Sequence, residues 1–388
     1  MTLDTSILFE PLTINGVTLR NRIVMPAMQR AWGQDGQIDD RTLDYYRERA
    51  AGGTGLLVTE SLAIDHPTAY IGGAELRINN DTRDGWERCV KAIHAEGAAF
   101  LMQLWHIGAV LPEGEGGLPG VSRISPSGLF DGQPRGVAAS RQDLEELKAA
   151  WVAAATTAMD LGADGVEIHM AHGYLLHQFL WDQSNVRTDG YGGDAMADRV
   201  RFPAEVVAAV RAAVGPEAIV SCRFSQWAEW DYDAKVAPTP ADLRVLVGAL
   251  ESAGVDIFNV STRYLSRPEW PDESELPLAG WIKSMTSKHV VAVGSVGLNI
   301  DFMSSAFTTL PETQTLDTSI GDAVTRMKRG EFDLLAVGRS IIGDPEFAAK
   351  VQQGRLSDIR QFTRADLSSV LADVHLPDEI RDNAGSRS

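Results

Sequence analysis

One unit recurs along the whole chain: an amphipathic helical segment that ends near a glycine, a short turn, and a run rich in Val, Ile and Leu. Glycine suits the end of a helix because it adopts the left-handed conformation without a Cβ clash. Short continuous apolar runs are typical of strands buried on both faces, as in a parallel sheet. Eight runs fit: Arg22–Met25, Gly55–Glu60, Ala99–Leu104, Gly165–His169, Ala218–Phe224, Asp256–Val260, His289–Val293 and Asp333–Val337.

Eight β-then-α units predict an α/β fold, a (β/α)8 TIM barrel. A doubly wound open sheet repeats the same unit, but the count of eight and the lack of a G-x-G-x-x-G motif after the first run favour the barrel. The segment Leu12–Arg20, around Asn15-Gly16, predicts an N-terminal β-hairpin that caps one barrel end. We therefore expect a single domain over residues 1–388, with the barrel at about 20–350 and a polar C-terminal tail at about 359–388.

Two connecting segments are longer than ordinary loops. Residues 107–140, rich in Gly, Pro and Ser, follow the third run, and residues 298–318 follow the seventh. Long loops after barrel strands lie on the catalytic face, so both segments are expected to shape the mouth of an active site.

The charge balance excludes some classes of protein. Thirty-five Lys and Arg oppose 53 Asp and Glu, a net charge of −18. This argues against binding nucleic acid, which needs a basic face, and against docking on an anionic membrane. The two cysteines, Cys89 and Cys222, cannot form a disulfide framework or ligate an iron–sulfur cluster.

The termini and the apolar runs bear on location. The N-terminus does not resemble a signal peptide, and no stretch of about 18 uninterrupted apolar residues is present. We expect a cytoplasmic protein with a small-molecule substrate, without a nucleic-acid or membrane partner. A homo-oligomer is compatible with this composition.

The densest group of reactive side chains follows the fourth run: His169, His172 and Tyr174, with His177 nearby. His169 is expected at the last strand position and His172 one turn beyond, so both imidazoles would converge on one ligand atom at the catalytic end of the barrel. A zinc site is the alternative, since His-x-x-His can chelate, but a third ligand is not evident. His177 is expected to pack on the following helix.

A glycine followed by a polar residue comes directly after the seventh run and again after the eighth: Gly294-Ser295 and Gly338-Arg339. In a (β/α)8 barrel these two loops commonly bind phosphate. Backbone N–H groups approach phosphate oxygens closely where Cβ is absent, and Arg339 adds a charge-assisted hydrogen bond. The plainer interpretation is two tight turns and a surface arginine.

Two polar residues interrupt apolar strands: Gln103 in the third run and Arg223 in the fifth. If the strands are correct, both side chains are buried and need partners. The edge of an aromatic heterocycle would supply them. Hydrogen bonds to nearby backbone, or an ion pair with Glu60 or Glu167, would also do so.

Several motifs together resemble the Old Yellow Enzyme family of FMN-dependent ene-reductases, which are TIM barrels. The resemblance extends over about residues 7–350, and its longest motif is the most specific. The motifs are HMAHGYLLHQFL at 169–180, NVRTDGYGG at 185–193, RVRF at 199–202, FEPL at 9–12, NRIVM at 21–25, QLWHIG at 103–108 and VGR at 337–339.

The resemblance implies a role for each matching residue. His169 and His172 would polarise a substrate carbonyl, Tyr174 would protonate its α-carbon, and Trp105 would border the substrate. FMN would be bound and NAD(P)H would donate hydride, so that the activated C=C bond of an enone or related nitro compound is reduced. The implied FMN-binding residues are Ala27, Met28, Gln29, Ser61, Gln103, His169, Arg223, Gly294, Ser295, Gly338 and Arg339.

One departure from the family pattern lies beside the flavin. Gln29 stands where the family usually has Thr or Cys. The longer carboxamide still donates a hydrogen bond but is not redox-active, so we expect a shifted flavin potential. Two further hypotheses stay open: a metal-dependent barrel hydrolase or aldolase that uses His169 and His172, and a non-catalytic flavin-binding protein.

Overall fold

Eight parallel strands close into a barrel, which confirms the predicted fold. The computed structural model describes residues 3–73, 75–111, 115–228, 231–299 and 315–367. Each strand pairs with its neighbour in chain order, and the last strand pairs with the first through Leu335–Ile23 and Ala336–Val24. The barrel strands are β3 (Ile23–Met25), β4 (Leu56–Val58), β7 (Ala99–Trp105), β12 (Gly165–His172), β13 (Ile219–Ala228), β14 (Ile257–Ser261), β15 (His289–Val293) and β16 (Leu334–Ala336).

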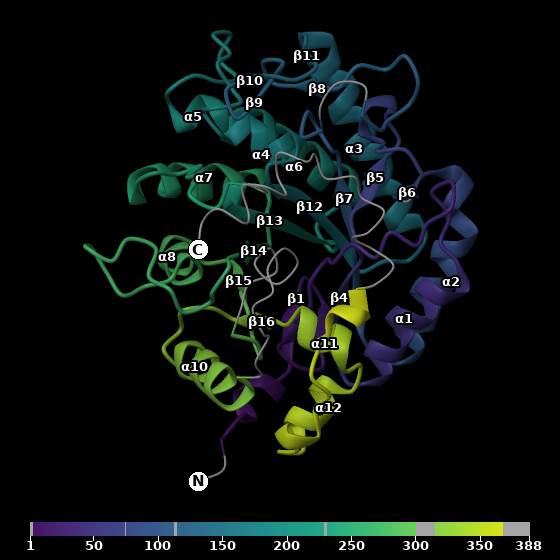
Figure 1. Cartoon of the computed structure of the whole chain (residues 1–388), viewed down its shortest axis with the longest axis vertical. Coiled ribbons are helices and arrows are strands. Elements are labelled where there is room, and N and C mark those ends of the chain that lie inside the picture. The colour runs from purple at the N-terminus through teal and green to yellow at the C-terminus, as the bar shows by residue number, and fades with distance from the viewer. Residues whose placement is uncertain (1–2, 74, 112–114, 229–230, 300–314, 368–388) are drawn as a thin grey trace.

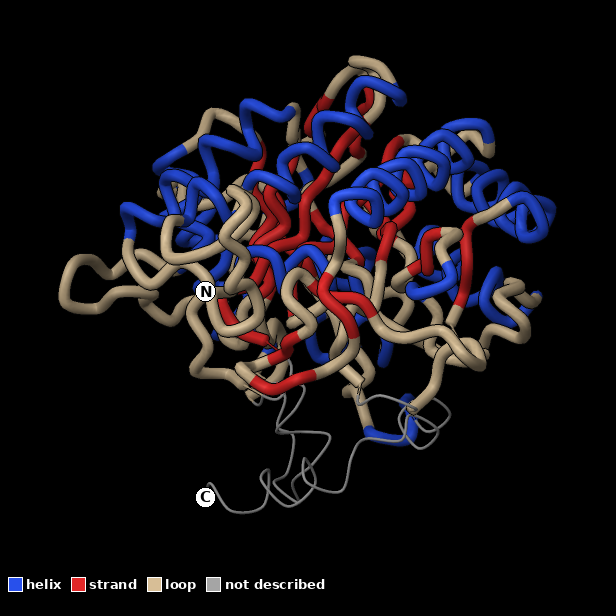
Figure 2. Tube along the Cα trace, turned by 90° about the horizontal axis from the view of Figure 1, so that it is seen from above, coloured by secondary structure: helices blue, strands red, loops and turns tan. Residues whose placement is uncertain are grey.

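Helices surround the barrel, as Figures 1 and 2 show. Each buries an apolar stripe on the strands, as Leu243, Leu246, Val247 and Leu250 do in α7. The main helices are α1 (Asp40–Ala51), α2 (Arg83–Ala95), α3 (Arg141–Asp160), α6 (Arg201–Val214), α7 (Pro240–Ala253), α8 (Leu278–Met285) and α10 (Leu316–Lys328). Shorter ones are α4 (Leu175–Leu180), α5 (Met196–Arg199), α11 (Arg339–Gly343) and α12 (Phe347–Gln352), with 3-10 turns η1 (Ser6–Phe9), η2 (Pro67–Ala69), η3 (Asn80–Thr82), η4 (Leu356–Asp358) and η5 (Arg364–Leu367).

The predicted hairpin closes the amino-terminal end of the barrel. Strands β1 (Leu12–Ile14) and β2 (Val17–Leu19) pair antiparallel around Asn15 and Gly16. Ile14 and Leu19 pack with Val24, Leu56 and other inward side chains, and the Asn15 side chain donates to the Ala218 carbonyl. The opposite, carboxyl end of the strands therefore remains for the site.

Additional short strands lie at the carboxyl end of the barrel. Short β5 (Leu62–Ile64) and β6 (Leu76–Ile78) extend from β7. The predicted long segment after β7 contains β8 (Ile124–Ser125), β9 (Leu129–Phe130), β10 (Gln133–Pro134) and β11 (Val137–Ala138). The long segment predicted at 298–318 lies mostly outside the described residues, as does the tail beyond 367.

Candidate active site

A β-bulge brings the two histidines of β12 together. The strand continues to His172, so the prediction that it ends at His169 is wrong. In a regular strand, residues three apart point to opposite faces. The pairing of β12 with β13 shifts register between Met170 and His172, and His172 has φ +63°. This bulge turns His172 back toward His169, and left-handed backbone at a non-glycine residue is a strained conformation that tends to occur at functional sites.

Four rings form a cluster at the end of β12. The His169 ring centroid lies 5.2 Å from that of His172 and 5.0 Å from that of Tyr174. The Trp105 ring, at the end of β7, contacts Tyr174 edge-on at 5.2 Å. The sequence therefore identified side chains that the fold does bring together. His177 is buried in α4, as expected.

Burial keeps both imidazoles of this cluster neutral. The pKa of His169 and that of His172 lie well below the usual value, first because burial penalises the imidazolium and second because the Arg223 cation is close. A neutral imidazole has one N–H donor and one acceptor nitrogen. Each ring can therefore offer a single hydrogen bond donor to a substrate oxygen.

Gln103 belongs to a network of buried hydrogen bonds. The sequence predicted that this side chain is buried and needs a partner, but not the other members of the network. Its amide nitrogen donates to Glu167 Oε1 at 2.8 Å, and its amide oxygen accepts from Ser61 Oγ at 2.7 Å. Glu167 Oε2 also accepts from Ser221 and Asn259, at 2.8 and 2.6 Å. Glu167, considered from sequence as an ion-pair partner, instead accepts a hydrogen bond from the Gln103 amide. The amide still has one N–H and one lone pair for a ligand.

Arg223 connects the strands to the loop after β3. Its Nη1 donates to the Ala27 carbonyl at 3.1 Å, while its buried Nε has no hydrogen bond partner among the described residues. Met28, the next loop residue, contacts one of the two glycine turns: a Cβ added at Gly338 would lie 3.3 Å from Met28 Sδ. Gln29 is half-buried in the same loop, and Ser61 contacts Gln103.

The two predicted phosphate turns lie side by side. Arg339 Nη2 is 3.5 Å from Ser295 Oγ, and Ser340 Oγ donates to the Val296 carbonyl at 2.9 Å. A Cβ at Gly294 would lie 2.6 Å from the Leu265 backbone nitrogen, so only glycine fits there. A cavity of about 290 Å³ adjoins Gly294 and Ser295. The two turns therefore form a single site, in which the Arg339 guanidinium lies beside backbone that a ligand can approach closely.

Glu60 supports the loop after β3. Its Oε2 accepts from the backbone N–H groups of Arg30 and Ala31, at 3.1 and 3.2 Å, and the side chain is fully buried. Burial raises the pKa of this carboxyl to about 7, despite those hydrogen bonds. Sequence reasoning considered Glu60 as a partner of Gln103 or Arg223, but the structure places it on the loop backbone.

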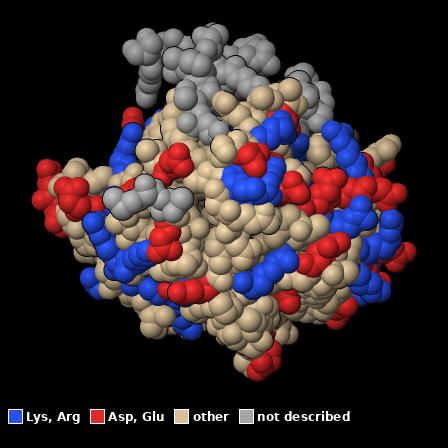
Figure 3. Space-filling view, turned by 90° about the horizontal axis from the view of Figure 1, so that it is seen from below, with Lys and Arg blue, Asp and Glu red and all other residues tan. Residues whose placement is uncertain are grey.

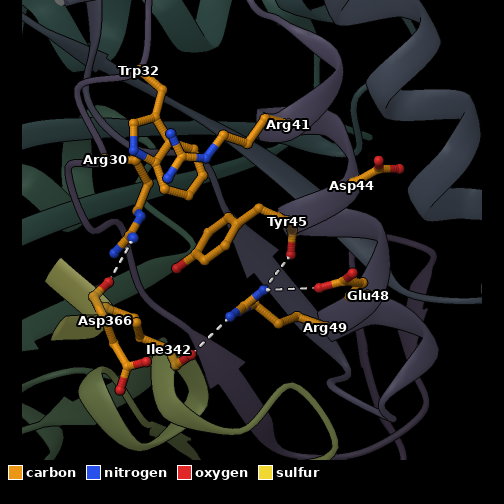
Figure 4. Close-up of a pocket in the computed structure, with 9 residues that line it drawn as sticks. All are labelled: Arg30, Trp32, Arg41, Asp44, Tyr45, Glu48, Arg49, Ile342 and Asp366. Atoms are coloured by element: carbon orange, nitrogen blue, oxygen red, sulfur yellow. Dashed lines mark hydrogen bonds and ion pairs between the residues drawn. The ribbon is translucent and has the colours of Figure 1, made fainter. Parts of the chain in front are cut away.

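A larger cavity, of about 550 Å³, lies outside the barrel between α1 and the C-terminal described residues (Figure 4). Two of its arginines already bond main-chain carbonyls: Arg30 bonds Asp366, and Arg49 bonds Tyr45, Ile341 and Ile342. The Arg49 guanidinium also lies 3.7 Å from the Tyr45 ring centroid. These contacts fasten α1 to the segment after β16, so we assign this cavity a structural role.

Within the described ranges, no three His, Cys, Asp or Glu side chains gather closely enough to hold a metal ion. None of the described helices has the length and apolar character needed to cross a membrane.

The closed barrel, the two adjacent glycine turns and the polar side chains buried within β7 and β13 are typical of one class of protein, the flavin-dependent barrel oxidoreductases. A family model described as "NADH:flavin oxidoreductase / NADH oxidase family" matches residues 7–304. The chain belongs to this family, the Old Yellow Enzyme family, which confirms the resemblance. The assignment indicates FMN as cofactor and NAD(P)H as reductant.

Individual relatives agree with this assignment. NADH oxidase of Thermoanaerobacter brockii is 32% identical over 375 residues, covering 94% of this chain but 53% of that protein. NADPH dehydrogenase of Clostridium acetobutylicum is 30% identical over 361 residues, covering 91% of this chain and 96% of that protein. The solved structure of morphinone reductase with tetrahydroNAD superposes with a TM-score of 0.75 at 25% identity, covering 93% of each chain. The chain thus spans about half the length of some relatives and nearly all of others.

The residues present fit FMN. Gln103 offers a donor and an acceptor in a fixed orientation, and Arg223 has an unbonded buried Nε. The Gly294 turn packs too closely on the Leu265 backbone for any other residue, and the Gly338 turn has only the Met28 side chain near the missing Cβ. Sequence reasoning missed two neighbours of His172: Ser261 at the end of β14 and Trp227 in β13. The sequence does carry one signal for Ser261, since it is a polar residue directly after an apolar run.

Proposed function

We propose that this protein is an FMN-dependent NAD(P)H oxidoreductase that reduces the activated C=C bond of α,β-unsaturated carbonyl or related nitro compounds. When bound, FMN supplies the hydride chemistry, accepting from NAD(P)H and delivering to the β-carbon of the substrate. The observation that carries the proposal is the cluster of two neutral imidazoles and a tyrosine at the mouth of the barrel.

His169 and His172 would polarise the substrate carbonyl. Their ring centroids are 5.2 Å apart and the rings are nearly perpendicular, at 80°. Two donors aimed at one oxygen stabilise the negative charge that develops there as hydride reaches the β-carbon. Because the rings are neutral, each supplies a hydrogen bond without a competing proton transfer.

Tyr174 would deliver the proton to the α-carbon. It is half-buried, and its ring contacts both His169 and Trp105 edge-on. A phenol is a weak acid with a pKa of about 10, suited to protonating a carbon that has gained electron density. Trp105 would form the adjacent wall for the apolar part of the substrate.

Gln103, Arg223, Gly294, Ser295, Gly338 and Arg339 would hold FMN, with Ala27, Met28, Gln29, Ser61 and His169 lining it. Gln103 would meet the heterocycle edge, because its amide is already oriented by Glu167 and Ser61. The two glycine turns and Arg339 would hold the phosphate. In an acidic protein this local cation opposes the overall field.

One experiment separates this proposal from its alternatives. The purified protein should be yellow, should bleach anaerobically with NADPH or NADH, and should regain colour when an enone such as cyclohexenone is added. A colourless protein with bound zinc would support the hydrolase or aldolase hypothesis. A yellow protein that never bleaches would support a non-catalytic flavin-binding protein.

The remaining expectations belong to the same proposal. We propose a single domain in the cytoplasm that acts on a small molecule and has neither a nucleic-acid nor a membrane partner. Light scattering of the purified protein tests whether it forms a homo-oligomer.

A further inference from the structure

We infer that Ser261, oriented by Arg223, holds His172 in the tautomer that carries its proton on Nδ1, so that Nδ1–H is the donor offered to the substrate. The inference rests on the proposed function only in naming what this donor binds. It makes Ser261 a positioning residue, acting through His172.

Ser261 reaches His172 from a different strand. It is the last residue of β14, it is 4% exposed, and its Oγ lies 2.9 Å from His172 Nε2. No hydrogen bond to a described residue engages Nδ1 of the same ring. The free nitrogen of His172 is therefore Nδ1, and its protonation depends on the direction of the Ser261 hydrogen bond.

Arg223 determines that direction. Its Nη2 lies 3.5 Å from Ser261 Oγ, a long contact in which the guanidinium can only donate. The buried cation also draws the lone pairs of Oγ toward itself, which turns the hydroxyl hydrogen away. The remaining neighbour of that hydrogen is His172 Nε2. The serine therefore donates, Nε2 accepts, and the proton of the neutral ring lies on Nδ1.

His169 is fixed in the opposite tautomer. The Ala171 backbone N–H donates to His169 Nδ1 at 3.3 Å, so this nitrogen accepts and the ring proton lies on Nε2. The site then presents two N–H donors of different kind, Nε2–H from His169 and Nδ1–H from His172. If His172 were also protonated on Nε2, that hydrogen would point at Ser261 Oγ and the free Nδ1 would have no proton to donate.

Trp227 holds the plane of the His172 ring. It stacks on the imidazole with centroids 4.4 Å apart and planes 23° apart, and its Nε1 donates to the Ser261 carbonyl at 3.2 Å. Ser225 Oγ accepts from the His172 backbone N–H at 2.9 Å and donates to the Trp227 carbonyl. The stack fixes the plane of the imidazole against Ser261 Oγ, and the hydroxyl hydrogen bond then determines which ring nitrogen carries the proton.

Nuclear magnetic resonance of holoenzyme labelled with ¹⁵N-histidine tests this directly. Long-range ¹H–¹⁵N correlation distinguishes a protonated from an unprotonated ring nitrogen, and His172→Gln identifies the signals of His172. We expect Nδ1 protonated and Nε2 unprotonated in the wild type. We expect the pattern to be lost in Ser261→Ala, to return in Ser261→Thr, and to persist in Ser284→Ala, which changes an exposed serine on α8.

Kinetics provide a second readout. Ser261→Ala should slow oxidation of the reduced enzyme by an enone about tenfold, the effect of losing one well-placed donor, while reduction by NAD(P)H changes less than about twofold. A wild-type His172 protonated on Nε2, or a Ser261→Ala pattern identical to wild type, overturns the inference even if enones are reduced. The expected tautomer in an enzyme that ignores enones would instead overturn the proposed function.

Discussion

Glu60→Gln tests how the loop after β3, which would line the flavin in the proposed function, is stabilised. Glu60 is fully buried, and its carboxylate accepts from the Arg30 and Ala31 backbone N–H groups. Burial raises its pKa from 4.5 to about 7. Each pKa unit corresponds to about 1.4 kcal/mol, so ionising this group in the folded protein costs about 3 kcal/mol relative to the unfolded chain.

The sign of the pH dependence follows from the raised pKa. The folded state binds the proton more tightly, so the contribution of Glu60 to the free energy of unfolding is greatest below about pH 4.5 and is lost as pH rises through about 7. Most of the ~3 kcal/mol disappears between about pH 5 and pH 8. The carboxamide introduced by Glu60→Gln does not titrate, and its oxygen can still accept from the loop, so the variant should lack this loss.

The assay is urea unfolding of the holoenzyme at about pH 5 and pH 8, followed by circular dichroism. The difference in unfolding free energy between Glu60→Gln and wild type should shift in favour of the variant by about 2 to 3 kcal/mol from the lower to the higher pH. Glu217→Gln, at an exposed position, controls for the loss of one acidic group. An equal pH dependence for wild type and Glu60→Gln would refute the reasoning.

Three further predictions concern the proposed chemistry. Tyr174→Phe should slow enone reduction by about a hundredfold or more, the usual effect of removing a general acid, and should leave flavin reduction by NAD(P)H nearly intact. Stopped-flow kinetics measure the two half-reactions separately, and an equal loss in both would reject the proton-donor role. Gln29→Thr should change the two-electron flavin potential, because a shorter donor replaces the carboxamide in the loop after β3; an unchanged potential in spectroelectrochemical titration would contradict a contact between Gln29 and the flavin. The second-order rate of reduction by NAD(P)H should rise with modest added salt, because salt screens the repulsion between a protein of charge −18 and an anionic cofactor. The face drawn in Figure 3 has acidic and basic groups interspersed. A rate that falls with added salt would point to a basic rim at the site.

Local patterns predicted the strands well because burial on both faces leaves a continuous apolar run. α3 begins with a capping box formed by Ser140 and Asp143, and α7 begins at Thr239 and Pro240, so both helix starts follow from side chain chemistry within one turn. Such features depend on neighbours in sequence. They need no knowledge of which strands lie side by side.

The environment of His172 could not be read in the same way. Its conformation depends on a bulge between β12 and β13 and on Ser261, 89 residues further along the chain. A bulge has no clear signature in an apolar run, and a serine at a strand end is ordinary until barrel closure brings β14 near β12. The sequence predicted which imidazoles meet, but not what fixes their orientation.

The site is continuous with the internal layers of the barrel, so its geometry depends on strand register. On β12, Glu167 and His169 point inward on successive layers, and Glu167 lies opposite Gln103 of β7 and Ser221 of β13. His169 lies opposite Arg223, and Arg223 opposite Asn259 of β14. A slip of one residue would turn Gln103 or Arg223 away from the interior, because side chains alternate between faces. Glu167 is hydrogen-bonded to the two strands beside β12, at Gln103 and Ser221, and to Asn259 on β14, one strand further on. These bonds therefore fix the register on which the two histidines and the proposed FMN contacts depend.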